Sequence, residues 1–351
     1  MFGTYKENDV TILLKDISGI ITPLGTEERE KLIQSGVHYS EMLPIEYVPS
    51  DDYIDIYKKT LKLYANLTAK AVASVAEKIY FDKGKDAVLV SLARAGTSIG
   101  VLIKRYIQYK FDVNVAHYTI SIIRGKGIDK NAMNYILSKH NAEDIQFVDG
   151  WTGKGAIQRE LNSAMTDYPG VSSGLAVLSD PAYISEKCGT HTDFFIASSC
   201  LNSTVSGLLS RTFYRNDVIE KDDFHGAAFY ENLLNEDVTY EFIDAIVNEF
   251  PNAKPMIDNA DDGKHISGLD EVNNICKEFN VSDINFVKPS IGETTRVLLR
   301  RVPWKILVHS LNDYEHLGHI YQLAKEKNVP VIEYPLSNYR ACGIIKSLAD
   351  T

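Results

Sequence analysis

The sequence is sparing in cysteine, the residue that builds disulfide frameworks and zinc knuckles. Four cysteines, Cys188, Cys200, Cys276 and Cys342, are scattered over 351 residues and form no CxxC pair. Such wide spacing argues against a disulfide-stapled secreted domain and predicts a reducing, cytoplasmic setting. We also find no secretory signal and no apolar run long enough to span a bilayer, so we expect soluble partners and no membrane partner.

An excess of positive charge is missing as well. The formal net charge is −10, which excludes nonspecific nucleic-acid binding by the chain as a whole and leaves room for a local basic face. The hydrophobic share of 44% and the charged share of 24% are typical of a globular protein. The length predicts two domains with ample core.

Strands and helices alternate over the first part of the chain. Apolar residues recur at helical spacing in residues 55–79, and further helices are predicted at 97–109, 130–139 and 157–165. Apolar runs predict strands at 87–92, 113–123, 145–148, 175–178 and 194–197. This alternation predicts an α/β fold with a mainly parallel sheet that is covered by helices on both faces. Ligands of such sheets bind beyond the carboxyl ends of the strands.

A second, smaller α/β unit is predicted toward the end of the chain. Residues 251–267 are rich in Pro, Gly, Asn and Asp and are typical of a linker. This linker separates a first domain at 1–250 from a second at 268–351. In the second domain we expect helices at 269–279, 293–301 and 313–327, strands at 284–287, 305–309 and 330–333, and a final helix at 336–348.

Three turns with phosphate-binding character fall at the predicted ligand edge of the first domain. In residues 145–156, IQFVDGWTGKGA, a strand ends at Asp149 and passes through a Thr-Gly-Lys-Gly turn into a helix. Backbone N–H groups at such a helix start suit a phosphate. Residues 91–96, SLARAG, supply Arg94, which can pair with phosphate oxygens. Residues 123–128, IRGKGI, supply Arg124 and Lys126 on a loop able to close over a charged substrate.

The order of these three turns resembles the type I phosphoribosyltransferases. The resemblance implies binding of phosphoribosyl diphosphate with magnesium and displacement of diphosphate at the anomeric carbon by an acceptor base. Gly150 stands where the family has a second acid, and Trp151 replaces a small residue. The implied roles are diphosphate binding by Arg94, Ala95 and Gly96, ribose and metal binding by Asp149 with Asp180 in support, closure by Arg124 and Lys126, and 5-phosphate binding by Thr152, Gly153, Lys154, Gly155 and Ala156.

Cys200 carries a second kind of chemistry. It follows the predicted strand and precedes an apolar segment, 205–209, that is expected to be helical. A helix start lowers a thiol pKa and favours a nucleophile. The bases available are His225 beside two acids, His191 and His38, and the alternative is a buried, inert thiol. Asp180 likewise has an alternative reading as a turn former before Pro181.

Four segments resemble one branch of the phosphoribosyltransferase-like proteins, found in tellurium-resistance and stress gene clusters. They are HYSEMLPIEY, VLVSLARAGTSIG, VDGWTGKGAI and SSCLNSTVSGLLSRTFY. Some members of that branch are called StiP-type cysteine proteases. The leading hypothesis is therefore a phosphoribosyltransferase in a stress pathway. The alternatives are a cysteine peptidase using Cys200 and His225, and a noncatalytic regulator that binds RNA or nucleotides. The oligomeric state stays open, a dimer included.

Residues 288–335 resemble the pelota-type RNA-binding domain. A Gly-Glu-Thr-Thr turn opens a helix, and the segment KNVPVIEY follows a second helix. The resemblance implies contact with RNA, and local positive charge agrees with phosphate contacts. The alternative is that the arginines are solvated or dock against the first domain. The residues expected at RNA are Lys288, Gly292, Glu293, Thr294, Thr295 and Arg296.

Overall fold

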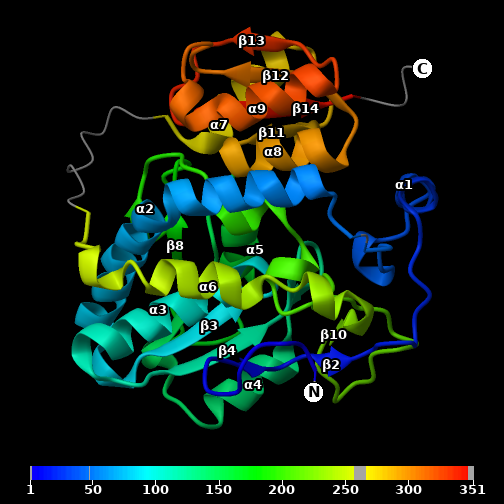
Figure 1. Ribbon diagram of the computed structural model, residues 1–351. Helices are drawn as coiled ribbons and strands as arrows, with labels where there is room; N and C mark the ends of the chain where they lie inside the picture. Colours follow the sequence, from blue (N-terminus) through cyan, green and yellow to red (C-terminus); the bar gives the residue numbers. More distant parts are fainter. Residues whose placement is uncertain (1, 47, 257–265, 347–351) are drawn as a thin grey trace.

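The computed structural model describes residues 2–46, 48–256 and 266–346, which form two α/β domains stacked on one another (Figure 1). The predicted fold class is confirmed: a parallel sheet with helices on both faces is followed by a small C-terminal α/β domain. The predicted linker includes residues 257–265, which lie outside the described residues, and the second domain begins with helix α7 at Gly268.

Six parallel strands form the sheet of the first domain, in the order β1-β4-β3-β7-β8-β9. The central strands are apolar and buried along their length, as expected of a sheet covered on both faces. The strands are β1 (Thr11–Ile12), β4 (Ala116–Ile120), β3 (Val88–Leu92), β7 (Ile145–Val148), β8 (Leu175–Ser179) and β9 (Lys187–Thr190).

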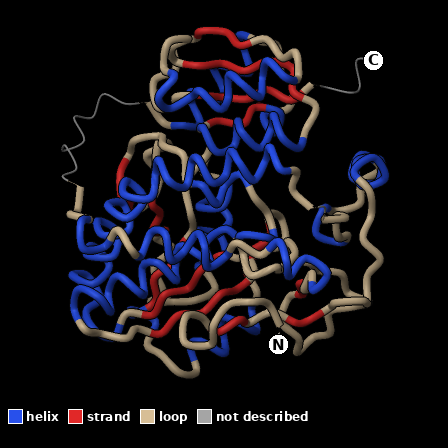
Figure 2. Tube along the Cα trace, in the orientation of Figure 1, coloured by secondary structure: helices blue, strands red, loops and turns tan. Residues whose placement is uncertain are grey.

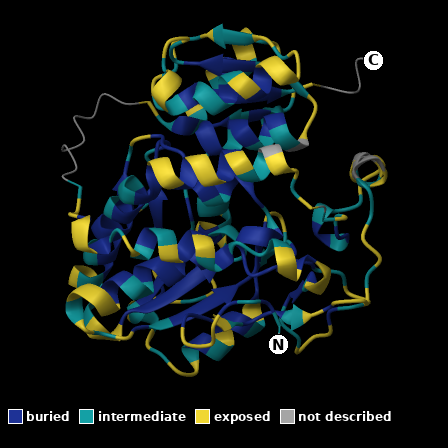
Figure 3. Cartoon of the chain, in the orientation of Figure 1, coloured by how far each residue is buried: buried dark blue, intermediate teal, exposed yellow. Residues whose placement is uncertain are grey.

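Helices cover both faces of this sheet, and the strands between them are buried (Figure 3). One face packs against α2 (Asp51–Lys83), α3 (Ala95–Phe111) and α6 (Thr239–Val247). The other packs against α4 (Lys130–Leu137) and α5 (Ala156–Met165). Within the described ranges, no helix combines the length and apolar character needed to cross a bilayer.

Short elements surround the edge of the sheet at which the strands have their carboxyl ends. Strands β5 (Ile122–Ile123) and β6 (Gly127–Ile128) form an antiparallel hairpin, and β2 (Lys15–Asp16) pairs with β10 (Gly226–Ala227). Helix α1 (Thr26–Gln34) lies on an arm between β2 and α2 (Figure 1). The hairpin carries the predicted cationic loop.

Two elements predicted near Cys200 do not form. Residues 194–197 have no strand, and residues 197–200 make a 3-10 turn instead. The expected helix at 205–209 is replaced by turns, in which the Ser206 hydroxyl donates to the carbonyl of Asn202 (2.7 Å) and Gly207 has φ +68°. Side chains of this kind compete with helical hydrogen bonds. Strand β9, not residues 194–197, forms this edge of the sheet. Its Gly189 lies too close to α2 for any side chain, because a Cβ would be 2.6 Å from the Ala71 carbonyl oxygen.

The second domain has a four-stranded sheet in the order β11-β14-β12-β13. Its core faces α7 (Gly268–Glu278) on one side and α8 (Ile291–Arg300) and α9 (Tyr314–Glu326) on the other. The predicted final helix is wrong, because residues 341–345 form a buried inner strand with apolar side chains facing both helix layers. The strands are β11 (Val287–Pro289), β12 (Pro303–Val308), β13 (Val331–Glu333) and β14 (Ala341–Ile345).

An apolar cluster runs without a break from the first domain into the second. Helix α8 packs on the turn at 197–200, which packs in turn on α2. Figure 2 shows the second domain stacked on the first. Phe195 stacks near His319 of α9, with ring centroids 4.7 Å apart. The C-terminal domain therefore rests directly on the ligand edge of the sheet.

Candidate functional site

The first two predicted phosphate turns meet at the carboxyl ends of β3 and β7. Helix α3 begins at Ala95 and lies so close to β7 that a Cβ at Gly96 would be 2.5 Å from the Val148 carbonyl oxygen and 3.1 Å from Asp149 Cα. Only glycine allows this approach. Gly96 therefore lies beside Asp149, where the ends of β3 and β7 are adjacent.

Asp149 is a carboxyl group with unusual acidity. Its Oδ1 accepts the N–H of Gly150 at 2.8 Å. Burial raises the pKa of Asp149 to about 6, while the Gly150 hydrogen bond and the charge of Arg296 act in the opposite direction. A carboxyl group with a pKa close to neutral is suited to proton transfer.

The Thr-Gly-Lys-Gly turn is fastened to both domains. Thr152 Oγ1 donates to Asp180 Oδ1 (2.5 Å), and Gly155 takes the left-handed conformation before α5. Tyr339 of the second domain donates to the Gly153 carbonyl at 2.6 Å. Lys154 donates to the carbonyl oxygens of Val287, at 3.2 Å, and Ile284. The lysine expected at a 5-phosphate thus points at the second domain.

The predicted cationic loop contacts residues 38–41. The N–H of Arg124 donates to the Tyr39 hydroxyl at 3.0 Å, and the His38 ring lies 3.1 Å from the Arg124 carbonyl oxygen. Lys126 pairs with Glu41 at 2.6 Å. Arg124 is exposed and Lys126 is paired, so the hairpin offers the guanidinium of Arg124 to a ligand more readily than the Lys126 ammonium.

Cys200 and His225 lie in different surroundings. The Cys200 thiol is fully buried and donates to the Ala197 carbonyl at 3.0 Å, at the end of the 3-10 turn and not at a helix start. The Nδ1 of His225 lies 2.9 Å from the Ser121 hydroxyl, and the backbone N–H of His225 donates to Asp129 Oδ2 at 2.6 Å. Cys200 therefore does not lie at a helix start, which was the reason for expecting it to be a reactive thiol.

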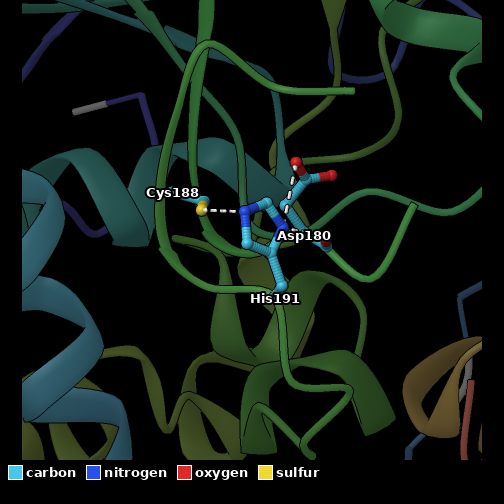
Figure 4. Close-up of side chains that lie close together, drawn as sticks. All are labelled: Asp180, Cys188 and His191. Carbon is cyan, nitrogen blue, oxygen red and sulfur yellow. Dashed lines mark hydrogen bonds and ion pairs between the residues drawn. The ribbon is translucent and has the colours of Figure 1, made fainter. Parts of the chain in front are cut away.

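A different thiol faces an imidazole, next to the turn that follows β8. Cys188 Sγ lies 3.5 Å from His191 Nε2, and His191 Nδ1 lies 2.8 Å from the Asp180 carbonyl oxygen and 3.7 Å from its carboxylate (Figure 4). A donor bond from Nδ1–H to the carbonyl leaves Nε2 as the basic nitrogen that faces the thiol. Tyr183 stacks flat on the imidazole at 4.0 Å. The arrangement has the order of a thiol, a base and an orienting group.

Asp180 has the contacts of a fixed structural carboxylate. Its two oxygens accept from the hydroxyls of Thr152 and Ser185 and from the N–H groups of Ile184 and Ser185. Asp180, Cys188 and His191 offer ligand atoms within 4.8 Å of one another. Four donor groups on one carboxylate leave little room for a cation, so the cluster is better suited to thiol chemistry than to a metal. The same bonds support the turn-former reading of Asp180.

The helix start expected at RNA is covered by the first domain. A Cβ at Gly292 would be 3.0 Å from the Ser199 hydroxyl oxygen. Thr294 and Thr295 are fully buried, and their hydroxyls form hydrogen bonds within the second domain. Arg296 donates to the Ser199 carbonyl (2.8 Å), pairs with Glu293 (2.9 Å) and lies 4.9 Å from the Trp151 ring centroid. A small cavity remains here, lined by Trp151, Ser179, Asp193, Phe194, Ile196, Ser199, Ser290 and Gly292.

The structure defines an α/β domain with a parallel six-stranded sheet, joined to a small α/β domain with a mixed four-stranded sheet. The chain belongs to the StiP family, described as tellurite-like stress resistance cysteine proteases, whose sequence pattern matches residues 3–247. The pattern of the PELOTA RNA-binding domain matches residues 266–347. The expected resemblances to the StiP family and to the pelota-type RNA-binding domain are therefore confirmed.

One curated relative is similar over nearly the whole chain. The cysteine protease StiP of Acinetobacter baylyi is 34% identical over 366 aligned positions, which cover 99% of this chain and 94% of the relative. Among solved structures, a hypoxanthine-guanine phosphoribosyltransferase from Bacillus anthracis has 15% identity and a TM-score of 0.26, and covers 36% of this chain and 71% of its own. That structural likeness is too low to support an argument about function.

Proposed function

We propose that this chain is a cysteine peptidase in which Cys188 is the nucleophile, His191 the base and Asp180 the group that holds the imidazole. The single observation that supports it most is the 3.5 Å approach of the Cys188 sulfur to His191 Nε2. The names of the family and of the 34% identical relative support the same chemistry. The proposed nucleophile differs from Cys200, which the sequence suggested for the peptidase alternative.

In this mechanism His191 takes the thiol proton and the Cys188 thiolate attacks the peptide carbonyl carbon. The imidazolium then returns the proton to the departing amine, leaving a thioester. Water attacks the thioester with His191 as base, which releases the acid and restores the thiol. Cys188 is only 5% exposed, so the substrate reaches the sulfur only after neighbouring side chains move.

The test measures hydrolysis of fluorescein-labelled casein by the full chain. We expect Cys188→Ser to lose activity, with Cys276→Ser, a partly exposed cysteine on α7, as the matched control that keeps it. Circular dichroism and thermal unfolding check that each variant is folded. If Cys200→Ser lost activity and Cys188→Ser kept it, the assignment would be contradicted and Cys200 would be the nucleophile.

Phosphoribosyl transfer is the second candidate, favoured by Asp149 with its pKa of about 6 next to Ala95 and Gly96. Magnesium binding by Asp149 and Asp180 finds little support, since the Asp180 oxygens are taken by protein donors and Gly150 offers no carboxylate. Calorimetric titration of phosphoribosyl diphosphate with magnesium tests this candidate. Binding lost in Asp149→Ala would support it, and no binding in the wild type would reject it.

RNA recognition is the proposed role of the C-terminal domain, on the strength of its match to the PELOTA pattern. Two of the residues expected at RNA, Gly292 and Arg296, lie against the first domain, as in the docking alternative. RNA would therefore bind to this face after the domains separate, or bind to another face of the domain. We propose a cytoplasmic location, which the wide spacing of the four cysteines along the sequence favours.

A further inference from the structure

Aromatic and basic side chains form a row on the second domain, where the end of α7 meets β12 and β13. The Lys305 ammonium lies 3.8 Å from the Trp304 ring centroid and 4.8 Å from that of Phe279. The ring centroids of Phe279 and Tyr334 are 5.6 Å apart. We call these four side chains the aromatic row. The proposed peptidase function uses none of them.

An irregularity in β12 explains how Trp304 comes to lie beside Lys305. Neighbouring residues of a regular strand point to opposite faces of the sheet. The pairing of β12 with β14 shifts register between Pro303 and Lys305, and a bulge of this kind re-aims side chains. At the other end of the row, the Tyr334 hydroxyl donates to Glu278 Oε2 at 2.7 Å, which fixes the orientation of that ring.

The aromatic row stays accessible while the two domains are docked. Trp304 is 38% exposed, and the other three side chains are half-buried. Strand β13 lies at the end of the second domain that is farthest from the first (Figure 1). The ring contacts of the row are made within the second domain. Docking therefore covers Gly292 and Arg296 but not the row.

Further basic groups lie close to the row. Lys277 is in the last turn of α7, two residues before Phe279, and Lys327 follows α9. The N–H of Lys346 donates to the Val302 carbonyl at 2.9 Å, next to the start of β12. All three lysines are exposed. Rings on which bases stack, with cations beside them for the phosphates, are the usual means of binding single-stranded nucleic acid.

We propose that the aromatic row binds single-stranded RNA by stacking its bases, and that it is the RNA surface of the docked protein. The proposal rests on the RNA role proposed above for this domain, which the match to the PELOTA pattern supports. A lysine between two rings favours a polyanion with flat bases over an apolar peptide. A row with three rings can stack only a few bases, so the docked protein should bind RNA weakly.

The test is fluorescence anisotropy of a short, fluorescein-labelled single-stranded RNA of mixed sequence, titrated with the full chain at low salt. We expect Trp304→Leu to weaken binding by about tenfold or more through loss of base stacking. Lys305→Gln should weaken binding and reduce its salt dependence, as expected for loss of a phosphate contact. Tyr314→Leu is the matched control and should bind as the wild type does, since Tyr314 is 70% exposed at the opposite end of the domain, at the start of α9.

Tryptophan fluorescence gives a second readout of the same site. The chain has two tryptophans, and a base stacked on Trp304 should quench its emission. Trp304→Leu keeps only Trp151, which lies against Arg296 at the domain interface. RNA should therefore quench the wild type and leave this variant unchanged. Thermal unfolding confirms that each variant is folded.

Three results would overturn the proposal, and they separate it from the RNA role on which it rests. No RNA binding by the wild type would reject both. Binding that Trp304→Leu and Lys305→Gln leave unchanged would reject the aromatic row and keep the RNA role. Equal affinity for the single strand and for the same strand annealed to its complement would reject base stacking, because a duplex hides the faces of its bases.

Discussion

The carboxylate of Asp193, in the first domain, accepts the backbone N–H of Ile291, the first residue of α8, at 3.2 and 3.1 Å from its two oxygens. The same carboxylate accepts the N–H of Arg340, next to β14, at 2.9 Å. Asp193 is 3% exposed. A negative group at a helix start is stabilising, so one buried side chain joins the two domains.

Removing this carboxylate should loosen the domain interface. Asp193→Ala leaves two N–H groups without an acceptor, each at a cost of about 1–3 kcal/mol. Urea unfolding followed by tryptophan fluorescence measures the loss. Asp193→Asn keeps one acceptor oxygen and should lose less, so equal stability of Asp193→Ala and the wild type would contradict this role.

The interface should also respond to pH. Burial raises the pKa of Asp193 to about 7, against the hydrogen bonds from Arg340 and Ile291, whereas an unfolded aspartate has the ordinary value of 3.8. Between these values the folded state holds the extra proton, so this group makes stability fall as pH rises from about 4 to 7. Melting temperatures across that range should fall less steeply for Asp193→Asn than for the wild type. Parallel profiles would reject this prediction.

Two glycines in helices of the second domain should respond oppositely to alanine. A Cβ at Gly268 would be 2.0 Å from the Tyr339 hydroxyl oxygen and 2.7 Å from Ala182 Cβ, whereas a Cβ at Gly318 meets nothing within 4 Å. Gly268→Ala should destabilise by about 1–3 kcal/mol through overpacking. Gly318→Ala should be neutral or stabilising by up to about 1 kcal/mol. Chemical denaturation distinguishes the two, and a neutral Gly268→Ala would count against the close contact.

The imidazole of His191 should set the reactivity of Cys188. His191→Gln removes the base 3.5 Å from the sulfur, so alkylation of Cys188 by iodoacetamide should slow at neutral pH and follow an ordinary thiol profile. Mass spectrometry of tryptic peptides reports each cysteine separately, and Cys276 serves as the internal reference. An unchanged Cys188 rate would show that the imidazole does not activate the thiol.

RNA affinity should rise when the domains separate. Because Gly292 and Arg296 contact Ser199 of the first domain, we expect the wild type to bind a polyuridine weakly and Asp193→Ala to bind it more tightly. Fluorescence anisotropy at low and high salt measures both, since phosphate contacts weaken with salt. Tight binding by the wild type that Arg296→Gln leaves unchanged would place the RNA surface elsewhere.

Much of the fold could be predicted because its helices and strands carry strong local patterns. The apolar runs of β3 and β7 and the long periodic helix α2 were recognised within a few residues of their observed bounds. The predictions are wrong where contacts between distant segments determine the secondary structure. Strand β14 contains Gly343 and follows a polar turn, and it is a strand because β11 and β12 pair with it on either side.

The candidate site was predicted unevenly for the same reason. Asp149 and the turns around it belong to a continuous strand–turn–helix pattern that one sequence window contains. Cys188 was missed because β9 is short and lies at the edge of the sheet. The spacing Cys-Gly-Thr-His in residues 188–191 was the only signal for the pair. The covering of α8 depends on contacts between distant segments, which periodicity does not reveal.

Lys154 belongs to the first domain, but its side chain forms hydrogen bonds with the second. Its ammonium holds the carbonyl oxygens of Val287 and Ile284, so a phosphate bound at the Thr-Gly-Lys-Gly turn competes with the second domain for the same group. Competition of this kind is reciprocal: whatever factor the docked domain takes from ligand affinity, the ligand takes from docking. A phosphate bound at the Thr-Gly-Lys-Gly turn would then weaken the docking of the second domain and increase its freedom to move.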